Sequence, residues 1–104
     1  MIIQAEELKK VLDEGKNVLL LDVREPDEYD ICHLENAHLI PMRDLPKRII
    51  ELNPGQQTVC YCHHGIRSLQ AAQWLSKNGF KNVKSLAGGI DQWAERIEPE
   101  MERY

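Results

Sequence analysis

A short apolar run without alternation, Val18 to Leu21, is the feature that most narrows the folds open to this chain. A strand with one face in water alternates apolar and polar residues, whereas a strand covered on both faces does not. The run therefore predicts a central strand of a parallel sheet with helices against both faces. A second run, Thr58 to Cys62, has the β-branched and aromatic character of another buried strand.

Segments with a helical spacing of apolar residues separate these strands. We expect helices over residues 5–14, 27–32, 45–52, 67–77 and 90–97. Residues 39–41 and 83–86 are the other strand candidates. Strands that alternate with helices indicate an α/β domain with a mainly parallel sheet, in which sites gather beyond the carboxyl ends of the strands.

Composition is consistent with one globular domain. The chain has 104 residues, of which 42% are hydrophobic and 29% charged, enough for one core without disulfide bonds. We expect a single domain over residues 1–104, with residues 98–104 as a peripheral surface tail. The formal net charge of −4 argues against nucleic acid or an anionic membrane as a partner.

The chain also gives expectations about its compartment. Its N-terminus lacks the basic and long apolar segments of a signal peptide, and no apolar run approaches the ~20 residues of a membrane helix. The three cysteines cannot all pair within the chain, so a reducing compartment would keep them as thiols. The sequence thus predicts a cytoplasmic protein.

The segment from Cys62 to Arg67 has the residues needed for nucleophilic cysteine chemistry. It lies between a predicted strand and a predicted helix, where successive N–H groups and the helix dipole favour an anion. A thiolate at Cys62 would be stabilised there. Gly65 permits a tight turn, and Arg67 can present a planar fork of donors to an oxyanion.

Three segments resemble, in the same order, the signatures of the rhodanese family of sulfurtransferases. They are Leu21-Asp22-Val23-Arg24-Glu25 with Glu28-Tyr29, Cys62-His63-His64-Gly65-Ile66-Arg67-Ser68, and Leu86-Ala87-Gly88-Gly89-Ile90-Asp91-Gln92-Trp93. Residues 33–41 also resemble a family segment, although Cys32 and Asn36 stand where the family usually has glycine.

The resemblance implies a single rhodanese-like domain with a five-stranded, mainly parallel sheet flanked by helices. It also implies that Cys62 attacks the sulfane sulfur of a small anionic donor such as thiosulfate and becomes a persulfide. An acceptor, cyanide, a thiol or a protein, then takes the outer sulfur. The implied substrate-binding residues are His63, His64, Gly65, Ile66, Arg67 and Ser68, braced by Asp22 and Arg24, with no metal or organic cofactor.

Several of these residues also have plainer structural interpretations. Cys60 is better explained as a small core residue than as a second reactive thiol, and Cys32 as inert. Cys60, Cys62, His63 and His64 could together be a zinc site, but their spacing is tighter than usual and no second ligand pair follows. The two histidines are expected to shape the electrostatics and access of the pocket.

Two other functions stay open. Cysteine-dependent phosphatases and arsenate reductases also hold a thiolate in an amide loop that ends in arginine, but with five intervening residues rather than the four between Cys62 and Arg67. The second alternative is not primarily an enzyme: it is a persulfide carrier or a regulatory protein-binding module with little small-molecule turnover. The physiological donor and acceptor and the oligomeric state do not follow from the sequence.

Overall fold

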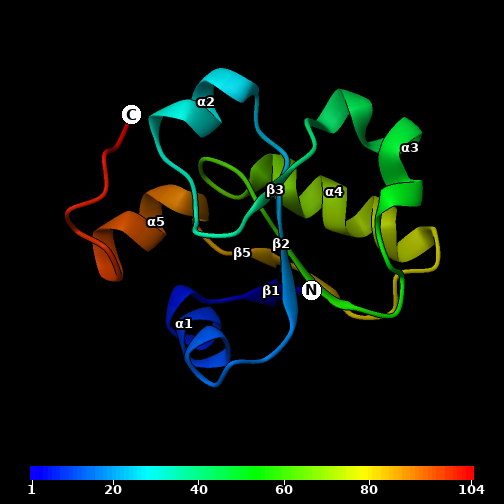
Figure 1. The fold of residues 1–104 in the computed structure, drawn as a ribbon, viewed down its shortest axis with the longest axis horizontal. Coiled ribbons are helices and arrows are strands. Elements are labelled where there is room, and N and C mark those ends of the chain that lie inside the picture. The colour runs from blue at the N-terminus through cyan, green and yellow to red at the C-terminus, as the bar shows by residue number, and fades with distance from the viewer.

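A five-stranded, fully parallel sheet in the order β1-β5-β4-β2-β3 forms the centre of the protein (Figure 1). The computed structural model describes residues 1–104. The strands are β1 (Ile2–Ile3), β2 (Val18–Asp22), β3 (His38–Leu39), β4 (Gln57–Tyr61) and β5 (Val83–Leu86). The α/β architecture expected from the unalternated runs is confirmed.

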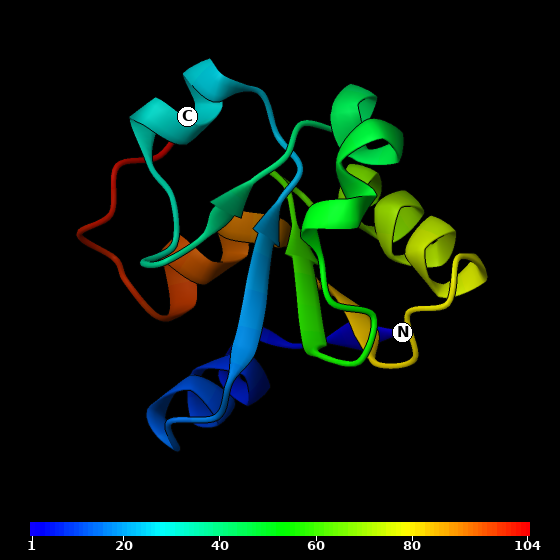
Figure 2. The ribbon, with the colours of Figure 1, turned by 45° about the vertical axis from the view of Figure 1, so that its right-hand side comes forward.

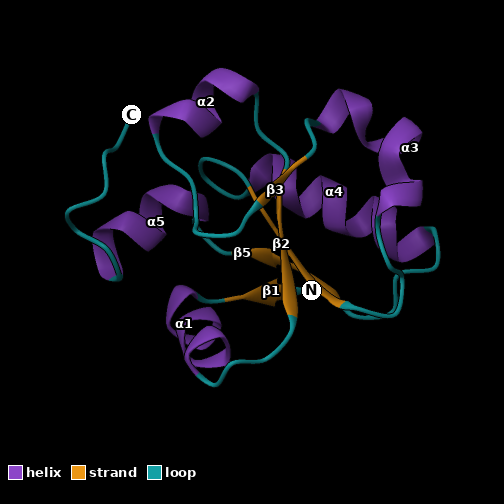
Figure 3. Ribbon diagram, viewed as in Figure 1, coloured by secondary structure: helices purple, strands orange, loops and turns teal.

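Helices connect the strands and cover both faces of the sheet (Figures 2 and 3). None of them combines the length and the apolar composition needed to cross a bilayer. They are α1 (Ala5–Asp13), α2 (Pro26–Ile31), α3 (Leu45–Arg48), α4 (Ile66–Lys77) and α5 (Gly89–Arg96), with 3-10 turns at Met42–Asp44 and Ile49–Glu51.

The core consists of two clusters, one on each face of the sheet. Cys60 and Cys62 belong to the cluster that includes α3 and α4, whereas Val59 and Tyr61 belong to the cluster that includes α1 and α5. Consecutive residues of a strand point to opposite faces, so the central strand β4 contributes to both cores. This is why its sequence is apolar without interruption.

The expected elements are close to those observed, with one clear difference. Residues 45–52 were expected to form one helix, but α3 ends at Arg48 and a 3-10 turn follows. Leu45 and Leu52 are buried, while Ile50 is 88% exposed, so little apolar packing supports a longer regular helix. The segment is therefore irregular.

The two departures from family glycines have different consequences. Asn36 has a φ of 64°, a left-handed conformation that asparagine tolerates better than most residues. Cys32 has a φ of −162°, which is extended backbone that any residue adopts. Neither substitution strains the turn between α2 and β3.

Candidate active site

The carboxyl ends of β2 and β4 bring two expected segments together. These strands are neighbours, with Asp22 in register with Tyr61, and the Val23 N–H donates to the Tyr61 carbonyl at 3.1 Å. Residues 22–24 and the loop from Cys62 to Ser68 therefore lie side by side at the carboxyl-terminal end of the sheet. This is the end at which parallel α/β sheets usually bind ligands.

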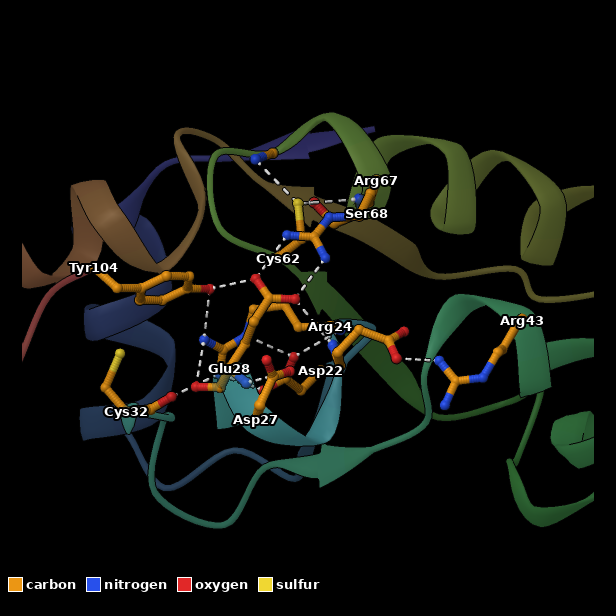
Figure 4. A network of polar contacts seen from close by, with 12 residues as sticks. Asp22, Arg24, Asp27, Glu28, Cys32, Arg43, Cys62, Arg67, Ser68 and Tyr104 are labelled. Carbon is orange, nitrogen blue, oxygen red and sulfur yellow. Dashed lines mark hydrogen bonds and ion pairs between the residues drawn. The ribbon is translucent and has the colours of Figure 1, made fainter. Parts of the chain in front are cut away.

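The sulfur of Cys62 sits at the N-terminal end of α4 (Figure 4). The backbone N–H groups of Gly65 and Ser68 donate to Sγ at 3.1 and 3.3 Å. Only 1% of Cys62 is exposed. Two amide donors and the helix dipole stabilise a thiolate at this position.

The turn around the sulfur depends on Gly65. This residue has a φ of 106°, a region that side chains rarely adopt, and it caps the N-terminus of α4. A Cβ at Gly65 would lie 3.3 Å from the Gly88 nitrogen and 3.4 Å from the Leu86 carbonyl oxygen. Both backbone conformation and space therefore favour glycine.

The start of α5 holds the other side of the loop. The Ile90 N–H donates to the Cys62 carbonyl at 2.9 Å, and the Asp91 N–H to the His63 carbonyl at 3.1 Å. Gly89 has a φ of 61°, and a Cβ there would lie 2.5 Å from the Cys62 carbonyl oxygen and closer still to that of His63. The glycine turn at the start of α5 therefore lies directly against the loop and supports it.

A pair of buried serines lies beneath the sulfur. Ser68 Oγ is 3.4 Å from Cys62 Sγ, and Ser85 Oγ on β5 is 2.7 Å from Ser68 Oγ. The exposed fractions of Ser68 and Ser85 are 0% and 2%. Sequence reasoning did not find Ser85, although a polar residue within an apolar strand is the kind of signal that could have drawn attention to it.

Arg67 is at the end of the loop, and its guanidinium is turned toward α2 (Figure 4). It donates to both carboxylate oxygens of Glu28, at 2.8 and 3.0 Å. The hydrogen bonds from Arg67 outweigh burial and lower the pKa of Glu28 to about 2, so this carboxylate is ionised at neutral pH. Glu28 was part of the matching signature but was not expected at the site.

The last residue of the chain also contacts the loop. The Tyr104 hydroxyl donates to Glu28 Oε2 at 2.7 Å and accepts from Arg24 at 2.9 Å, and its ring stacks on His63 with centroids 3.8 Å apart. Burial raises the pKa of Tyr104 to about 12, so the phenol keeps its proton. Most of residues 98–104 is exposed, but this side chain was not expected at the site.

Asp22 and Arg24 form a buried ion pair behind the loop. Both side chains are fully buried, and the guanidinium donates to the two Asp22 oxygens at 2.9 and 2.6 Å. Burial lowers the pKa of Arg24, but hydrogen bonds with Asp22 and Tyr104 more than compensate. Arg24 also donates to the Cys32 carbonyl at 2.7 Å, so the pair ties α2 to the edge of the sheet.

His63, His64 and Asp91 form a small polar cluster beside the loop. The rings of His63 and His64 are stacked, with centroids 3.9 Å apart. Burial and the neighbouring His64 lower the pKa of His63, which favours a neutral ring. Ligand atoms of His63, His64 and Asp91 lie within 4.8 Å of one another, although Arg103 already binds Asp91 at 2.9 Å.

The cysteines do not join this cluster. Cys60 is fully buried in the core, and burial raises the pKa of its thiol to about 12. Cys32 is partly exposed, and burial raises the pKa of its thiol as well. The group of potential ligands that lies within 4.8 Å, His63, His64 and Asp91, contains no cysteine.

Comparisons with known proteins agree with this architecture. The family model described as "Rhodanese-like domain" matches residues 4–96. A protein named "Sulfurtransferase" from Allochromatium vinosum is 37% identical over 92 residues, which are 88% of this chain and 86% of that protein. A rhodanese-related protein from Thermoplasma volcanium has a solved structure with a TM-score of 0.85, 32% identity and 93% of each chain covered.

Other relatives are longer proteins. The probable adenylyltransferase/sulfurtransferase MoeZ of Mycobacterium tuberculosis is 38% identical over 104 residues, which are 98% of this chain but 26% of that protein. The putative sulfur carrier protein YrkF of Bacillus subtilis is 35% identical over 96 residues, 92% of this chain and 52% of its own length. The chain thus spans about a quarter to a half of these relatives. The family match, the identity and the shared fold together show that the chain belongs to the rhodanese-like domain family.

Proposed function

We propose that this protein is a sulfurtransferase in which Cys62 carries the transferred sulfur as a persulfide. The observation that carries the proposal is the position of Cys62 Sγ, which accepts N–H groups from Gly65 and Ser68 at the start of α4. Cysteine attacks as its thiolate, and these two N–H groups point at the atom that carries the charge in that form. The sulfurtransferase and sulfur carrier names among the relatives are in line with this chemistry.

The reaction divides into two displacements at sulfur. The Cys62 thiolate attacks the sulfane sulfur of a donor such as thiosulfate, the bond to that sulfur breaks, and the donor remnant leaves with the electron pair. An acceptor such as cyanide, a thiol or a protein then attacks the outer sulfur, and the Cys62 thiolate is regenerated. The covalent intermediate divides the transfer into two exchanges of one thiolate for another nucleophile at sulfur.

The loop has further donors for the outer sulfur. The N–H groups of His64, Ile66 and Arg67 donate to no other protein atom. Backbone donors around one concavity favour an anionic group. We assign them the role of holding the persulfide, whose negative charge resides on its terminal sulfur.

A carrier role is the second candidate. Cys62 is only 1% exposed, so bulky acceptors need a docked approach to reach its sulfur. A persulfide carrier would load readily and transfer slowly to small acceptors but rapidly to its protein partner. Phosphate ester hydrolysis is disfavoured, because Arg67, which would hold the phosphate, is bound by Glu28.

Intact-mass spectrometry after incubation with sulfane donors tests the proposal. The native protein should gain one sulfur atom that is lost on reduction, and Cys62→Ser should gain none. Cys60→Ala is the matched control, because Cys60 is buried in the core and should not affect loading. A folded native protein that gains no sulfur from thiosulfate or from a persulfide would refute the sulfurtransferase function.

The expected working compartment follows from the same chemistry. Cys32, Cys60 and Cys62 are all free thiols, and a reducing compartment such as the cytoplasm maintains them. An oxidising compartment would compete with persulfide formation at Cys62. We propose the cytoplasm on this ground.

A further inference from the structure

The arginine that ends the active-site loop is already neutralised by a carboxylate of the same chain. Arg67 makes two hydrogen bonds to Glu28, and Glu28 also accepts from the Tyr104 hydroxyl and from the Glu25 N–H at 3.0 Å. The Glu28 side chain is only 17% exposed. Besides the two guanidinium N–H groups, the Tyr104 hydroxyl and the Glu25 N–H therefore hold this carboxylate in place.

The arginines and carboxylates around the active-site loop therefore have a net charge close to zero. The Arg67 guanidinium faces the ionised Glu28, and the other arginines around the loop are paired as well, Arg24 with Asp22 and Arg103 with Asp91. A dianionic donor such as thiosulfate would approach a site with no uncompensated guanidinium. Its sulfonate would have to take the fork of Arg67 away from Glu28.

From this pairing, and resting on the proposed function, we propose that Glu28 discriminates against dianionic sulfur donors and that Cys62 is loaded by thiol persulfides, R–S–SH. The Cys62 thiolate attacks the outer sulfur, and the S–S bond of the donor breaks. The thiolate R–S⁻ leaves with the electron pair and gives the Cys62 persulfide Cys–S–SH, whose outer sulfur then releases its proton to solvent and becomes the anion that the loop N–H groups hold. The donor reacts in its protonated form, R–S–SH, in which the attacked sulfur is neutral, so it needs no guanidinium.

The test compares two donors on three proteins. Rates of Cys62 persulfide formation are measured with thiosulfate and with 2-mercaptoethanol persulfide generated in solution, for the native protein, Glu28→Gln and Glu51→Gln. Glu51 is the matched control, because it is also bound twice by one arginine, Arg48, at 2.7 and 3.0 Å, but lies outside the loop. Both substitutions remove one negative charge without changing the size of the side chain.

We expect the native protein to react at least tenfold faster with the persulfide than with thiosulfate. Glu28→Gln should accelerate the thiosulfate reaction about tenfold. The substitution removes the repulsion between the Glu28 carboxylate and the dianionic donor, and in a partly buried site one such repulsion has an effect of that order. It should change the persulfide reaction less than twofold, and Glu51→Gln should change neither.

Equal native rates with the two donors would overturn the inference while leaving the persulfide chemistry of Cys62 intact, and this comparison needs no variant. An unchanged or slower thiosulfate reaction in folded Glu28→Gln would overturn it as well. Failure of both donors to load the native protein would instead refute the proposed function, and the inference with it.

Discussion

The contact between Gly89 and the active-site loop gives the sharpest test of how this site is built. Gly89→Ala adds a methyl group that would overlap the carbonyl oxygens of Cys62 and His63. It also places a side chain at a φ of 61°. Gly15 is the matched control, because it has a similar φ of 72° with nothing within 4 Å of an added Cβ.

The two substitutions share one cost and differ in another. The left-handed conformation costs alanine about 1–2 kcal/mol at either position. At Gly89 the loop and α5 must also move apart, which weakens the hydrogen bonds from Ile90 and Asp91 to the loop, each worth about 1 kcal/mol. We expect losses in unfolding free energy of about 3–4 kcal/mol for Gly89→Ala and about 1–2 kcal/mol for Gly15→Ala.

Thermal and urea unfolding measure the difference. An additional loss of about 2 kcal/mol corresponds to a further fall in Tm of about 8–16 °C in a domain of this size. Gly89→Ala should also slow alkylation of Cys62 by iodoacetamide, and Gly15→Ala should not. Equal losses of stability in the two variants would refute the idea that close packing of α5 supports the loop.

Three other predictions concern groups around the sulfur and the core. Ser85→Ala removes the hydrogen bond to Ser68, which is worth about 1 kcal/mol, and should slow Cys62 alkylation about fivefold at neutral pH. An unchanged rate would show that the serine pair does not affect the reactivity of Cys62. Because the pKa of Glu28 falls from 4.5 to about 2 on folding, its stabilising effect is complete above pH 4.5 and is lost as the pH falls toward 2. Urea unfolding at pH 7 and pH 2 should therefore show a loss about 1–2 kcal/mol smaller in Glu28→Gln than in the native protein, after allowance for solvent screening; equal losses would contradict this. Cys60→Ala should cost about 1 kcal/mol by leaving a small cavity but should not alter the persulfide yield by mass spectrometry, and a reduced yield would show that Cys60 takes part in loading.

Local patterns predicted the fold well because the main strands are buried on both faces. The unalternated run from Val18 and the β-branched run into Cys62 indicated central parallel strands, and β2 and β4 are those strands. The loop was found for a similar reason, since its cysteine, glycine and arginine are adjacent in sequence. Irregular α3 was missed because helical spacing does not show how much of a segment the core will cover.

The partners of the loop could not be predicted in the same way. Ser85 lies 17 residues from Ser68, Glu28 lies 39 residues from Arg67, and Tyr104 lies 76 residues from Glu28. Contacts over such separations depend on the folded chain rather than on local periodicity. Arg67 accordingly looked available for an oxyanion in the sequence, whereas in the structure it has a carboxylate partner.

The alternation along β4 has a consequence for insertions and deletions. Cys60 and Cys62 contribute to one core, Val59 and Tyr61 to the other, and the Tyr61 hydroxyl accepts the Leu34 N–H at 3.1 Å. Adding or removing a single residue within Gln57–Tyr61 would exchange these faces and direct the thiol away from α4. Changes of length are therefore more readily accommodated in the exposed turn around Gly55, whereas within the strand only changes by two residues would preserve the facing of Cys62.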